Sequence, residues 1–356
     1  MSFHKDFFHA IENILWIFLK PFFFSLDPEK AHHFVIGAMK FFSPIFYFRK
    51  SFYDFKINGK NHPSLEKEVF GIKFPNPVGL AAGFDKNAEV FKEMSSLGFG
   101  FIEIGTVTPV SQDGNPKKRI FRLVNDNALI NRFGFNNDGV DKITERLRNK
   151  GNVIIGGNIG KNKVTPNEKA KDDYLICFKA LFDYVDYFAV NVSSPNTPNL
   201  RDLQNINDLR GILSPLIKEN KKRESKPILI KISPDLIDDD IKDLVDMALD
   251  LKIDGIITSN TTIKRNNLKS KKKLTDESGG LSGQPLNNRS TDIIRLIHEY
   301  SNKKLPIIGV GGIMTTQDAL DKINAGASLI QLYTGFIYNG PSFARNINKE
   351  IIKSLN

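Results

Sequence analysis

Cysteine is almost absent from this 356-residue chain, which has only Cys177. One thiol cannot build an internal disulfide framework or a cysteine-based structural zinc site, and such scarcity fits a reducing compartment. Long apolar runs are also lacking. The longest near the N-terminus spans residues 14–19 and ends before Lys20, whereas a bilayer-spanning helix needs about 20 residues. No signal peptide is expected, because Asp6 and Glu12 interrupt the start and no small-residue cleavage site follows.

Charge of one sign is in modest excess. The chain has 50 Lys and Arg against 40 Asp and Glu, a net charge of +10. Hydrophobic residues make up 40% and charged residues 25%, as in soluble globular proteins, which excludes disordered and fibrous classes. The two basic runs, residues 221–223 and 271–273, contain no interleaved aromatic residues. We therefore interpret them as solvated loops and expect no nucleic-acid partner.

Phenylalanine is concentrated at one end of the chain. Of the 28 Phe residues, 14 fall in the first 55 residues, among them Phe48, Phe52 and Phe55. Five apolar residues in this region recur at the spacing of an amphipathic helix: Phe7, Phe8, Ile11, Leu15 and Phe18. Asp27 and Pro28 predict the start of a second helix that runs towards Phe42. Residues 1–55 are thus predicted to form a two-helix membrane module or a tunnel for a lipophilic ligand. A helical pair that only packs on the main core is an equal alternative.

From residue 75 onward, short apolar segments rich in β-branched residues alternate with polar or helical stretches. There are eight: Pro77–Ala82, Phe101–Thr106, Val153–Asn158, Tyr187–Val192, Ile228–Ile232, Gly255–Ser259, Pro306–Val310 and Leu329–Tyr333. Such strands indicate a parallel sheet buried on both faces. Eight units predict an α/β fold, a (β/α)8 TIM barrel over residues 56–356 with a small N-terminal helical extension. A doubly wound sheet is disfavoured, because residues 79–83 do not match the G-x-G-x-x-G pattern.

Polar and small residues follow the predicted strands, where the functional residues of barrels gather. They are residues 81–86, Thr106, Asn158, residues 191–197 and residues 259–262. Lys231 lies in the middle of an apolar strand, and burying it is costly unless it faces an anion or an electron-rich ligand. Any single residue of this set could be a turn cap, but the set as a whole favours a ligand site.

Glycine-rich loops complete the pattern. Residues 309–313 and 333–335 follow the last two predicted strands, where barrels commonly bind phosphate through backbone N–H groups. A phosphate cradle, a strand lysine and several amide side chains together predict a flat phosphorylated cofactor such as FMN. Lys231 would lie near the electron-rich edge of its ring.

Several long strings in the sequence resemble a known family. GLAAGFDKN, IEIGTVTP, INRFGFNNDG, NIGKNK, NVSSPNTPNLR, SNTT, GGLSGQPL and IIGVGGI are similar to dihydroorotate dehydrogenases, specifically the membrane-associated, quinone-dependent class 2 enzymes. The resemblance spans the whole chain and includes residues 27–32. It implies oxidation of (S)-dihydroorotate to orotate, in pyrimidine (UMP) biosynthesis, with a quinone as acceptor.

The resemblance also implies which residues form the site. FMN would be bound by Ala81, Ala82, Gly83, Phe84, Asp85, Thr106, Asn158, Asn191, Lys231, Ser259, Gly283, Gly312, Tyr333 and Thr334. Dihydroorotate and orotate would contact Lys86, Asn131, Arg132, Phe133, Gly134, Phe135, Asn191, Asn196, Asn260 and Thr261. Asn side chains match the amide edges of the substrate ring, and Lys86 its carboxylate. No metal is expected.

Ser194 is the implied catalytic base. It would take the C5 proton while the C6 hydride passes to the flavin. A serine hydroxyl is a weak base, so Thr197 and a water are expected to relay the proton, with Phe135 limiting solvent access. The soluble class 1 enzymes have a cysteine as this base, whereas residues 192–195 contain no thiol. Cys177 is interpreted as a small buried hydrophobe.

His32 and Arg122 resemble the polar groups that meet the quinone head, with Tyr333 between the tunnel and the flavin. His32 could instead be an ordinary helix histidine, and Arg122 a structural ion-pair partner. The acceptor would be ubiquinone or menaquinone, and a monomer peripheral to the cytoplasmic side of a bacterial cell membrane is expected. Three alternatives stay open: a soluble class 1 enzyme with another acceptor, an FMN barrel acting on a different acid, and a flavin- or ligand-binding protein without activity.

Overall fold

The computed structural model describes residues 2–46, 56–57 and 60–355, with side chains described for residues 12–46 and 62–355. Phe48, Phe52, Phe55 and the predicted domain boundary after residue 55 lie outside the described residues. The side chains of Phe7, Phe8 and Ile11 also lie outside the described part, so the predicted apolar stripe can be followed only from residue 12 onward.

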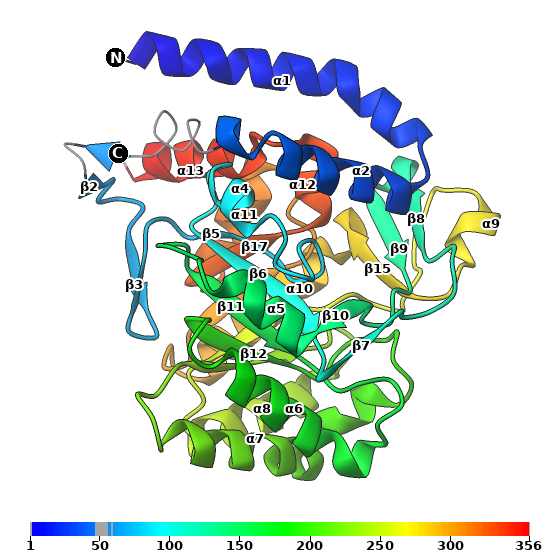
Figure 1. The fold of residues 1–356 in the computed structure, drawn as a ribbon, viewed down its shortest axis with the longest axis vertical. Coiled ribbons are helices and arrows are strands. Elements are labelled where there is room, and N and C mark those ends of the chain that lie inside the picture. The colour runs from blue at the N-terminus through cyan, green and yellow to red at the C-terminus, as the bar shows by residue number, and fades with distance from the viewer. Residues whose placement is uncertain (1, 47–55, 58–59, 356) are drawn as a thin grey trace.

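Eight parallel strands close into a barrel, as predicted (Figure 1). In chain order they are β5 (Val78–Leu80), β6 (Phe101–Val107), β11 (Ile155–Ile159), β12 (Tyr187–Asn191), β13 (Ile228–Ile232), β14 (Gly255–Thr258), β16 (Ile307–Val310) and β17 (Leu329–Leu332). Pairing of β17 with β5 closes the ring. All their residues are buried, because helices cover the outside and side chains fill the inside, and this explains the nearly continuous apolar runs.

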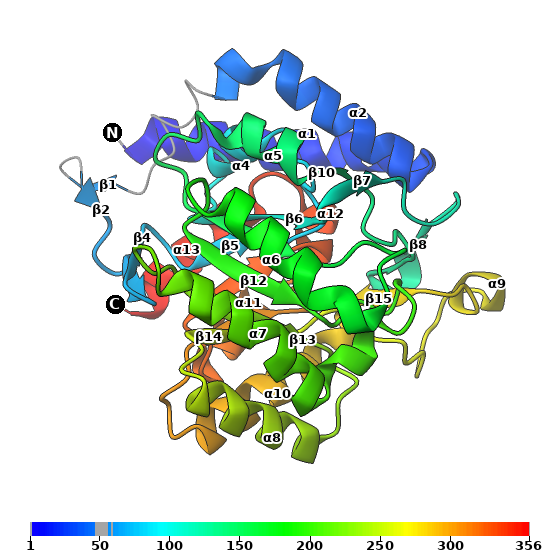
Figure 2. The ribbon, with the colours of Figure 1, turned by 60° about the horizontal axis from the view of Figure 1, so that its bottom comes forward.

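Helices surround the barrel (Figure 2). They are α4 (Phe91–Ser95), α5 (Val140–Leu147), α6 (Ala170–Leu181), α7 (Ile206–Asn220), α8 (Asp238–Asp250), α10 (Asn287–Tyr300), α11 (Thr316–Asn324), α12 (Thr334–Asn339) and α13 (Phe343–Ser354). Cys177 lies fully buried on α6, where its thiol contacts the carbonyl of Val107. It therefore packs as a small hydrophobe, as predicted.

Two long insertions meet over the carboxyl ends of the barrel strands. The first follows β6 and contributes β8 (Ile120–Leu123) and β9 (Ala128–Asn131), and the second follows β14 and contributes β15 (Gly280–Gly283). These strands form one antiparallel sheet in the order β15-β9-β8. The sequence did not predict it, since each strand has only four residues and β15 pairs with β9 across about 150 positions of the chain.

Smaller elements complete the chain. β7 (Val110–Gln112) pairs with β10 (Asn137–Gly139), β3 (Lys67–Val69) with β4 (Ile72–Phe74), and β1 (Lys56–Ile57) with β2 (Lys60–Asn61). The hairpin of β3 and β4 brings Phe74 against Phe101 inside the barrel. Short helical turns lie at α9 (Lys272–Thr275), η1 (Val124–Asp126), η2 (Asn167–Lys169), η3 (Leu200–Gln204) and η4 (Gln284–Leu286).

The N-terminal residues form two helices, α1 (Ser2–Ser25) and α2 (Pro28–Phe41). The Asp27 side chain caps α2 by accepting hydrogen bonds from the N–H groups of Glu29 and Lys30, so the predicted start of this helix is confirmed. α1 continues past Pro21 and bends towards its C-terminal end (Figure 1). Proline removes one helical hydrogen bond, which accounts for a bend here.

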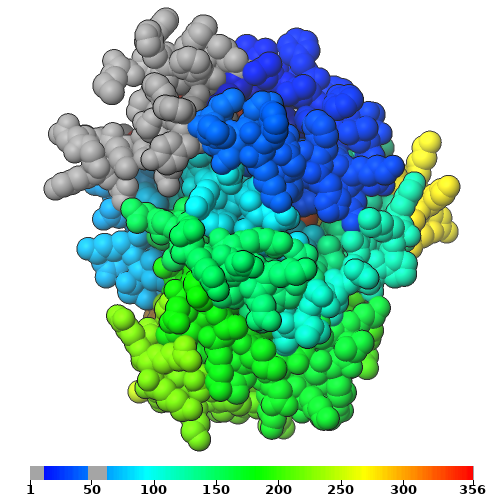
Figure 3. All heavy atoms as spheres, viewed as in Figure 1, coloured from blue at the N-terminus to red at the C-terminus, as the bar shows by residue number. Residues whose placement is uncertain are grey.

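The two helices are joined to the barrel by polar contacts. Trp16 donates to the carbonyl of Tyr338 at 3.2 Å, and Arg122 on β8 donates to the carbonyls of Phe24 and Leu26. Glu29 forms a buried ion pair with Arg119 at 2.7 Å. The two helices cover one end of the molecule (Figure 3). Their outer face is apolar, with Phe18 76% and Phe41 79% exposed. Of the helices formed by described residues, none combines the length and apolarity required to cross a bilayer.

Candidate functional site

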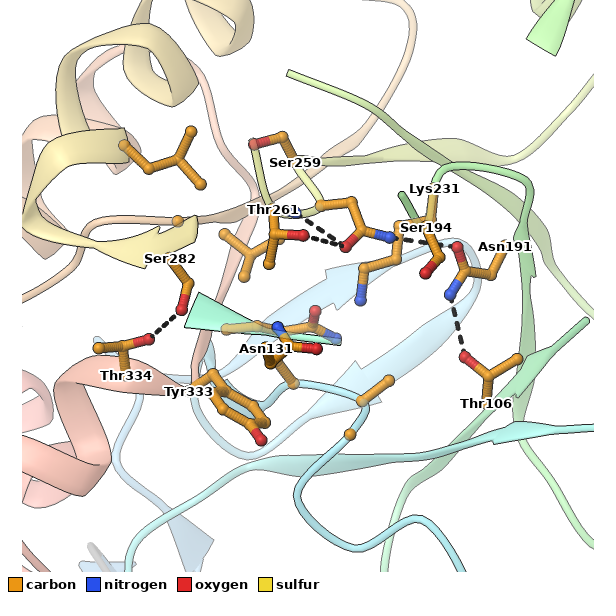
Figure 4. A pocket seen from close by; sticks show the side chains of 18 of the residues that line it. Thr106, Asn131, Asn191, Ser194, Lys231, Ser259, Thr261, Ser282, Tyr333 and Thr334 are labelled. Carbon is orange, nitrogen blue, oxygen red and sulfur yellow. Dashed lines mark hydrogen bonds between the residues drawn. The ribbon is translucent and has the colours of Figure 1, made fainter. Parts of the chain in front are cut away.

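A cavity of about 990 Å³ opens at the carboxyl ends of the barrel strands (Figure 4). Most of the predicted site residues line it, and they come from sequence motifs spread between residues 81 and 334. They are Ala81, Ala82, Gly83, Lys86, Thr106, Asn131, Phe133, Gly134, Phe135, Asn191, Ser194, Asn196, Lys231, Ser259, Asn260, Thr261, Gly283, Gly312, Tyr333 and Thr334. We call this the polar cavity. Strand ends distant in sequence thus converge on one ligand-sized space.

Amide and hydroxyl side chains form a connected network at one end of the polar cavity. Asn191 donates to the Thr106 hydroxyl at 3.0 Å and to the Asn158 amide oxygen at 3.1 Å, and Thr106 donates to the same oxygen at 2.6 Å. Asn260 donates to Asn191 at 3.3 Å and to Ser193 at 3.0 Å. These mutual bonds fix each amide in one orientation, so the edges that face the cavity have a defined donor and acceptor pattern.

Ser194 lies in the same wall and is buried. Its hydroxyl oxygen accepts a hydrogen bond from the N–H of Asn196 at 3.2 Å, and the Asn196 side chain donates to Asn131 at 3.1 Å. The Asn196 amide oxygen and the Thr197 hydroxyl are buried without a partner. Buried polar atoms of this kind are normally satisfied, which indicates that a ligand or water completes the site.

Several residues that hold this wall were not singled out from the sequence. Arg201 donates to the carbonyls of Ser193 at 3.0 Å and Thr261 at 2.7 Å, and so ties the loops after β12 and β14 together. Asn115 donates to the carbonyls of Arg132 and Asn196, both at 3.0 Å. No local sequence pattern predicts the role of Arg201 or of Asn115, because each residue joins loops that are far apart in the chain.

A second group missed from the sequence lies inside the barrel. Glu103 on β6 is fully buried and forms an ion pair with Lys231 at 3.1 Å. Gln331 on β17 donates to the same carboxylate at 2.7 Å and reaches the polar cavity. The signal was present, since both residues interrupt apolar strands in the same way as Lys231.

Glycines form the opposite end of the polar cavity. A Cβ at Gly312 would lie 2.3 Å from the Asn287 backbone, and one at Gly283 would lie 2.2 Å from the Asn127 carbonyl oxygen. Both residues have positive φ, 75° and 99°, and only glycine adopts such a conformation without strain. Ser282 and Thr334 hydrogen bond to each other at 2.8 Å beside them (Figure 4).

A second cavity, of about 1410 Å³, lies between the barrel and the two N-terminal helices. Its wall is mainly apolar and includes Trp16, Phe23, Phe24, Ala38, Met39, Phe42, Phe84 and Phe336. We call it the apolar cavity. Lys86, Phe133 and Tyr333 line both cavities and therefore separate them.

The charged groups at this boundary are perturbed by burial. Burial, with the nearby Arg119 second, lowers the pKa of Lys86 to about 8, and its ammonium lies 4.0 Å from the centre of the Phe133 ring. Burial, followed by the charges of Lys86 and His33, lowers the pKa of His32 to about 3, so this imidazole is neutral at pH 7. Burial also raises the pKa of Tyr333 to about 12.

Some predicted site residues lie away from the polar cavity. Asp85 holds the turn that precedes α4, since its carboxylate accepts hydrogen bonds from the N–H groups of Glu89 and Val90, and Arg132 forms an ion pair with Glu277. Asn158 lies beneath the wall and reaches the cavity only through Thr106 and Asn191. Phe84, His32 and Arg122 line the apolar cavity instead.

No cluster of three or more His, Cys, Asp or Glu side chains suited to a metal ion occurs in the described portion of the chain. The polar cavity is therefore characterised by its amides, hydroxyls, glycines and two lysines, Lys86 and Lys231.

Known proteins share the sequence and the fold of this chain. Residues 64–355 match the family model "Dihydroorotate dehydrogenase". The chain is 56% identical to the dihydroorotate dehydrogenase (quinone) of Christiangramia forsetii, over 94% of this chain and 98% of that protein. It is 47% identical to the enzyme of the same name from Idiomarina loihiensis, over 92% and 98%. The ligand-free crystal structure of DHODH from Eimeria tenella superposes with a TM-score of 0.83 at 40% identity, covering 93% of this chain and 95% of that one. The chain therefore belongs to the dihydroorotate dehydrogenase family.

Proposed function

We propose that this protein oxidises (S)-dihydroorotate to orotate in pyrimidine (UMP) biosynthesis, with FMN as cofactor and a membrane quinone as electron acceptor. One observation carries the proposal: a polar cavity suited to a flavin and an amide-rich acid shares Lys86, Phe133 and Tyr333 with a separate apolar cavity. The relatives named dihydroorotate dehydrogenase (quinone) support the same reaction.

The residues present fit FMN. Gly283 and Gly312 line the polar cavity, where their backbone N–H groups would bind the phosphate. Both positions need glycine, because a Cβ would collide with the backbone of Asn127 or Asn287. At the other end, Lys231 supplies positive charge, while the buried Ser259 hydroxyl and Gln331 amide oxygen have no protein partner. Four residues would line the cofactor: Thr106, Asn191, Tyr333 and Thr334. Asn158 would orient Thr106 and Asn191 through its hydrogen bonds to both. When bound, FMN supplies the hydride acceptor and later transfers the electrons to the quinone.

Dihydroorotate would be bound by the amide network. Its ring carries amide N–H and C=O groups, which match the fixed side chains of Asn131, Asn196 and Asn260. Its carboxylate needs a positive partner, and Lys86 is charged below its pKa of about 8. Phe133, Gly134 and Phe135 would cover the substrate and exclude water.

Ser194 would act as the base. Its Oγ would take the proton from C5 of the substrate, and the N–H of Asn196, which donates to this oxygen, would hold it in place. The unpartnered Thr197 hydroxyl lies three residues further along the same loop and could pass the proton to water. A serine instead of a thiol at this position disfavours a class 1 enzyme with a soluble acceptor.

The apolar cavity would admit the quinone. Neutral His32 and the Arg122 guanidinium are polar groups in its wall and would meet the quinone carbonyls. We infer that residues 1–55 form the quinone-access module and residues 56–356 the catalytic barrel. The exposed apolar face of α1 and the net charge of +10 favour peripheral attachment to an anionic membrane. The proposed form is a monomer on the cytoplasmic side of that membrane.

An anaerobic visible spectrum of the purified protein tests the proposal. We expect a flavin band that dihydroorotate bleaches and a soluble quinone restores. Recovery with fumarate or NAD and not with quinone would reject the quinone acceptor and favour a class 1 activity. A flavin band that dihydroorotate leaves unchanged would reject the substrate.

A further inference from the structure

A buried carboxylate lies behind the polar cavity without lining it. Glu103 on β6 has no exposed surface, yet two residues that contact it, Lys231 and Gln331, reach the cavity wall. A charge is kept in such a place only where its neighbours satisfy it. The reaction proposed above gives Glu103 no role, so its contacts need a separate explanation.

Four donors from four other strands converge on Glu103. Its Oε1 accepts from Asn158 on β11 at 2.8 Å and from Lys231 on β13 at 3.1 Å. Its Oε2 accepts from Gln331 on β17 at 2.7 Å and from the Tyr187 hydroxyl on β12 at 3.2 Å. A carboxylate has about four acceptor positions, so all are used. Such a saturated network holds its members in one geometry.

This network determines which end of Gln331 is free. Its amide nitrogen donates to Glu103, so its amide oxygen is the end left to other partners, and that oxygen is buried without one. A ligand N–H in the polar cavity would satisfy it. The pyrimidine ring of a flavin has an imide N–H between two carbonyls. Gln331 would accept from this N–H, and the ammonium of Lys231 would donate to the oxygen or nitrogen beside it.

Glu103 also limits the charge that the site presents. Lys231 and Glu103 together are neutral, so the field of the ammonium at the cavity is partly cancelled. The reduced flavin carries more negative charge than the oxidised flavin, and the balance between Lys231 and Glu103 would affect the relative stability of the two forms.

We propose that Glu103 is a positioning residue of the flavin site. Through the contacts described, it directs the Lys231 ammonium and the Gln331 amide oxygen towards the pyrimidine edge of the cofactor, and its own charge lowers the preference for reduced flavin. This inference rests on the proposed function in one respect, the binding of FMN in the polar cavity.

The midpoint potential of the bound flavin in Glu103→Gln provides the test. Removing the negative charge should favour the reduced form about tenfold more than in the wild type, a rise of about 30 mV for a two-electron couple. Glu145→Gln on α5 is the matched control, because this exposed residue loses the same charge outside the barrel. An unchanged or lowered potential in a folded, flavin-loaded Glu103→Gln protein would overturn the proposal.

Gln331→Leu tests the second contact and does not depend on the first variant folding. We expect the dissociation constant of FMN, measured by the recovery of free-flavin fluorescence on dilution of the holoenzyme, to rise about tenfold. An unchanged constant would remove Gln331 from the site. A wild-type flavin that ignores dihydroorotate would reject the proposed substrate but leave these comparisons intact, whereas a wild-type protein that binds no flavin would overturn both.

Discussion

The polar and apolar cavities lie side by side and are built in different ways. In the polar cavity nearly every amide is fixed by another side chain, as in the bonds that join Asn191 to Thr106, Asn158 and Asn260. The wall of the apolar cavity is mostly hydrocarbon from α1, α2 and the neighbouring barrel helices. Polar recognition requires particular atoms in particular directions, whereas apolar recognition requires mainly shape and volume.

This difference predicts how each cavity responds to change. A single substitution in the polar cavity should abolish one step, since each group has its own role. A substitution in the apolar cavity should matter only when it alters the space available. The shared wall of Lys86, Phe133 and Tyr333 should keep the two effects separate.

The largest effect is expected from Ser194→Ala in the polar cavity. Loss of the base should slow flavin reduction by dihydroorotate about 1000-fold, within the range usual for general base catalysis. Stopped-flow bleaching of the flavin band measures it.

FMN content should stay at the wild-type value, because Ser194 is not among the residues proposed to bind FMN. Quinone reoxidation of chemically reduced flavin should also stay at its wild-type rate, because that step needs no proton from dihydroorotate. Ser214→Ala, on the exposed face of α7, is the matched control. Near-normal bleaching in Ser194→Ala would show that another group takes the proton.

The contrast between the cavities also explains what could be predicted from sequence. The barrel followed from eight apolar segments, and most polar-cavity residues followed from motifs at the strand ends. Glu103 and Gln331 were missed although they interrupt strands as Lys231 does. Their importance lies in contacts between strands, and those are not visible before the barrel closes.

The insertions and the apolar cavity were harder to predict for another physical reason. β9 pairs with β15 through residues about 150 apart, so no local pattern announces the sheet. Many apolar residues can fill a hydrophobic wall equally well, so the Phe-rich sequence predicted the kind of cavity but not its members. Arg122 was considered as an ion-pair partner or a quinone ligand, and the structure adds bonds to the carbonyls of Phe24 and Leu26.

An intermediate effect is expected when the apolar cavity is filled. Ala38→Trp on α2 should raise the KM for quinone about thirtyfold, equivalent to ~2 kcal/mol of lost binding. A steady-state assay with a soluble quinone measures it. Lys30→Ala, at an exposed position of the same helix, is the control.

Flavin bleaching by dihydroorotate should be unchanged in Ala38→Trp, because the substituted side chain faces only the apolar cavity. Equal losses in both half-reactions would mean that the two cavities are not independent.

The smallest effect is expected from pH, and it should distinguish the cavities without any mutation. Burial lowers the pKa of Lys86 from 10.5 to about 8, so its ammonium is charged below pH 8 and loses its proton above it. Attraction for the substrate carboxylate is therefore present at pH 7 and mostly lost at pH 9. The KM for dihydroorotate should rise about tenfold between these values, since the charged fraction falls by that factor.

The KM for quinone should change much less over the same interval, because burial keeps His32 neutral with a pKa of about 3 and a quinone has no charge for the Lys86 ammonium in the shared wall to attract. In Lys86→Arg the guanidinium remains charged throughout, so the dependence of the dihydroorotate KM on pH should flatten even if binding is weaker overall. A tenfold rise that persists in Lys86→Arg would assign the titration to a different group. A constant KM in the wild type would mean that the carboxylate is bound by neutral donors, and the polar cavity would then recognise its substrate through hydrogen bonds alone.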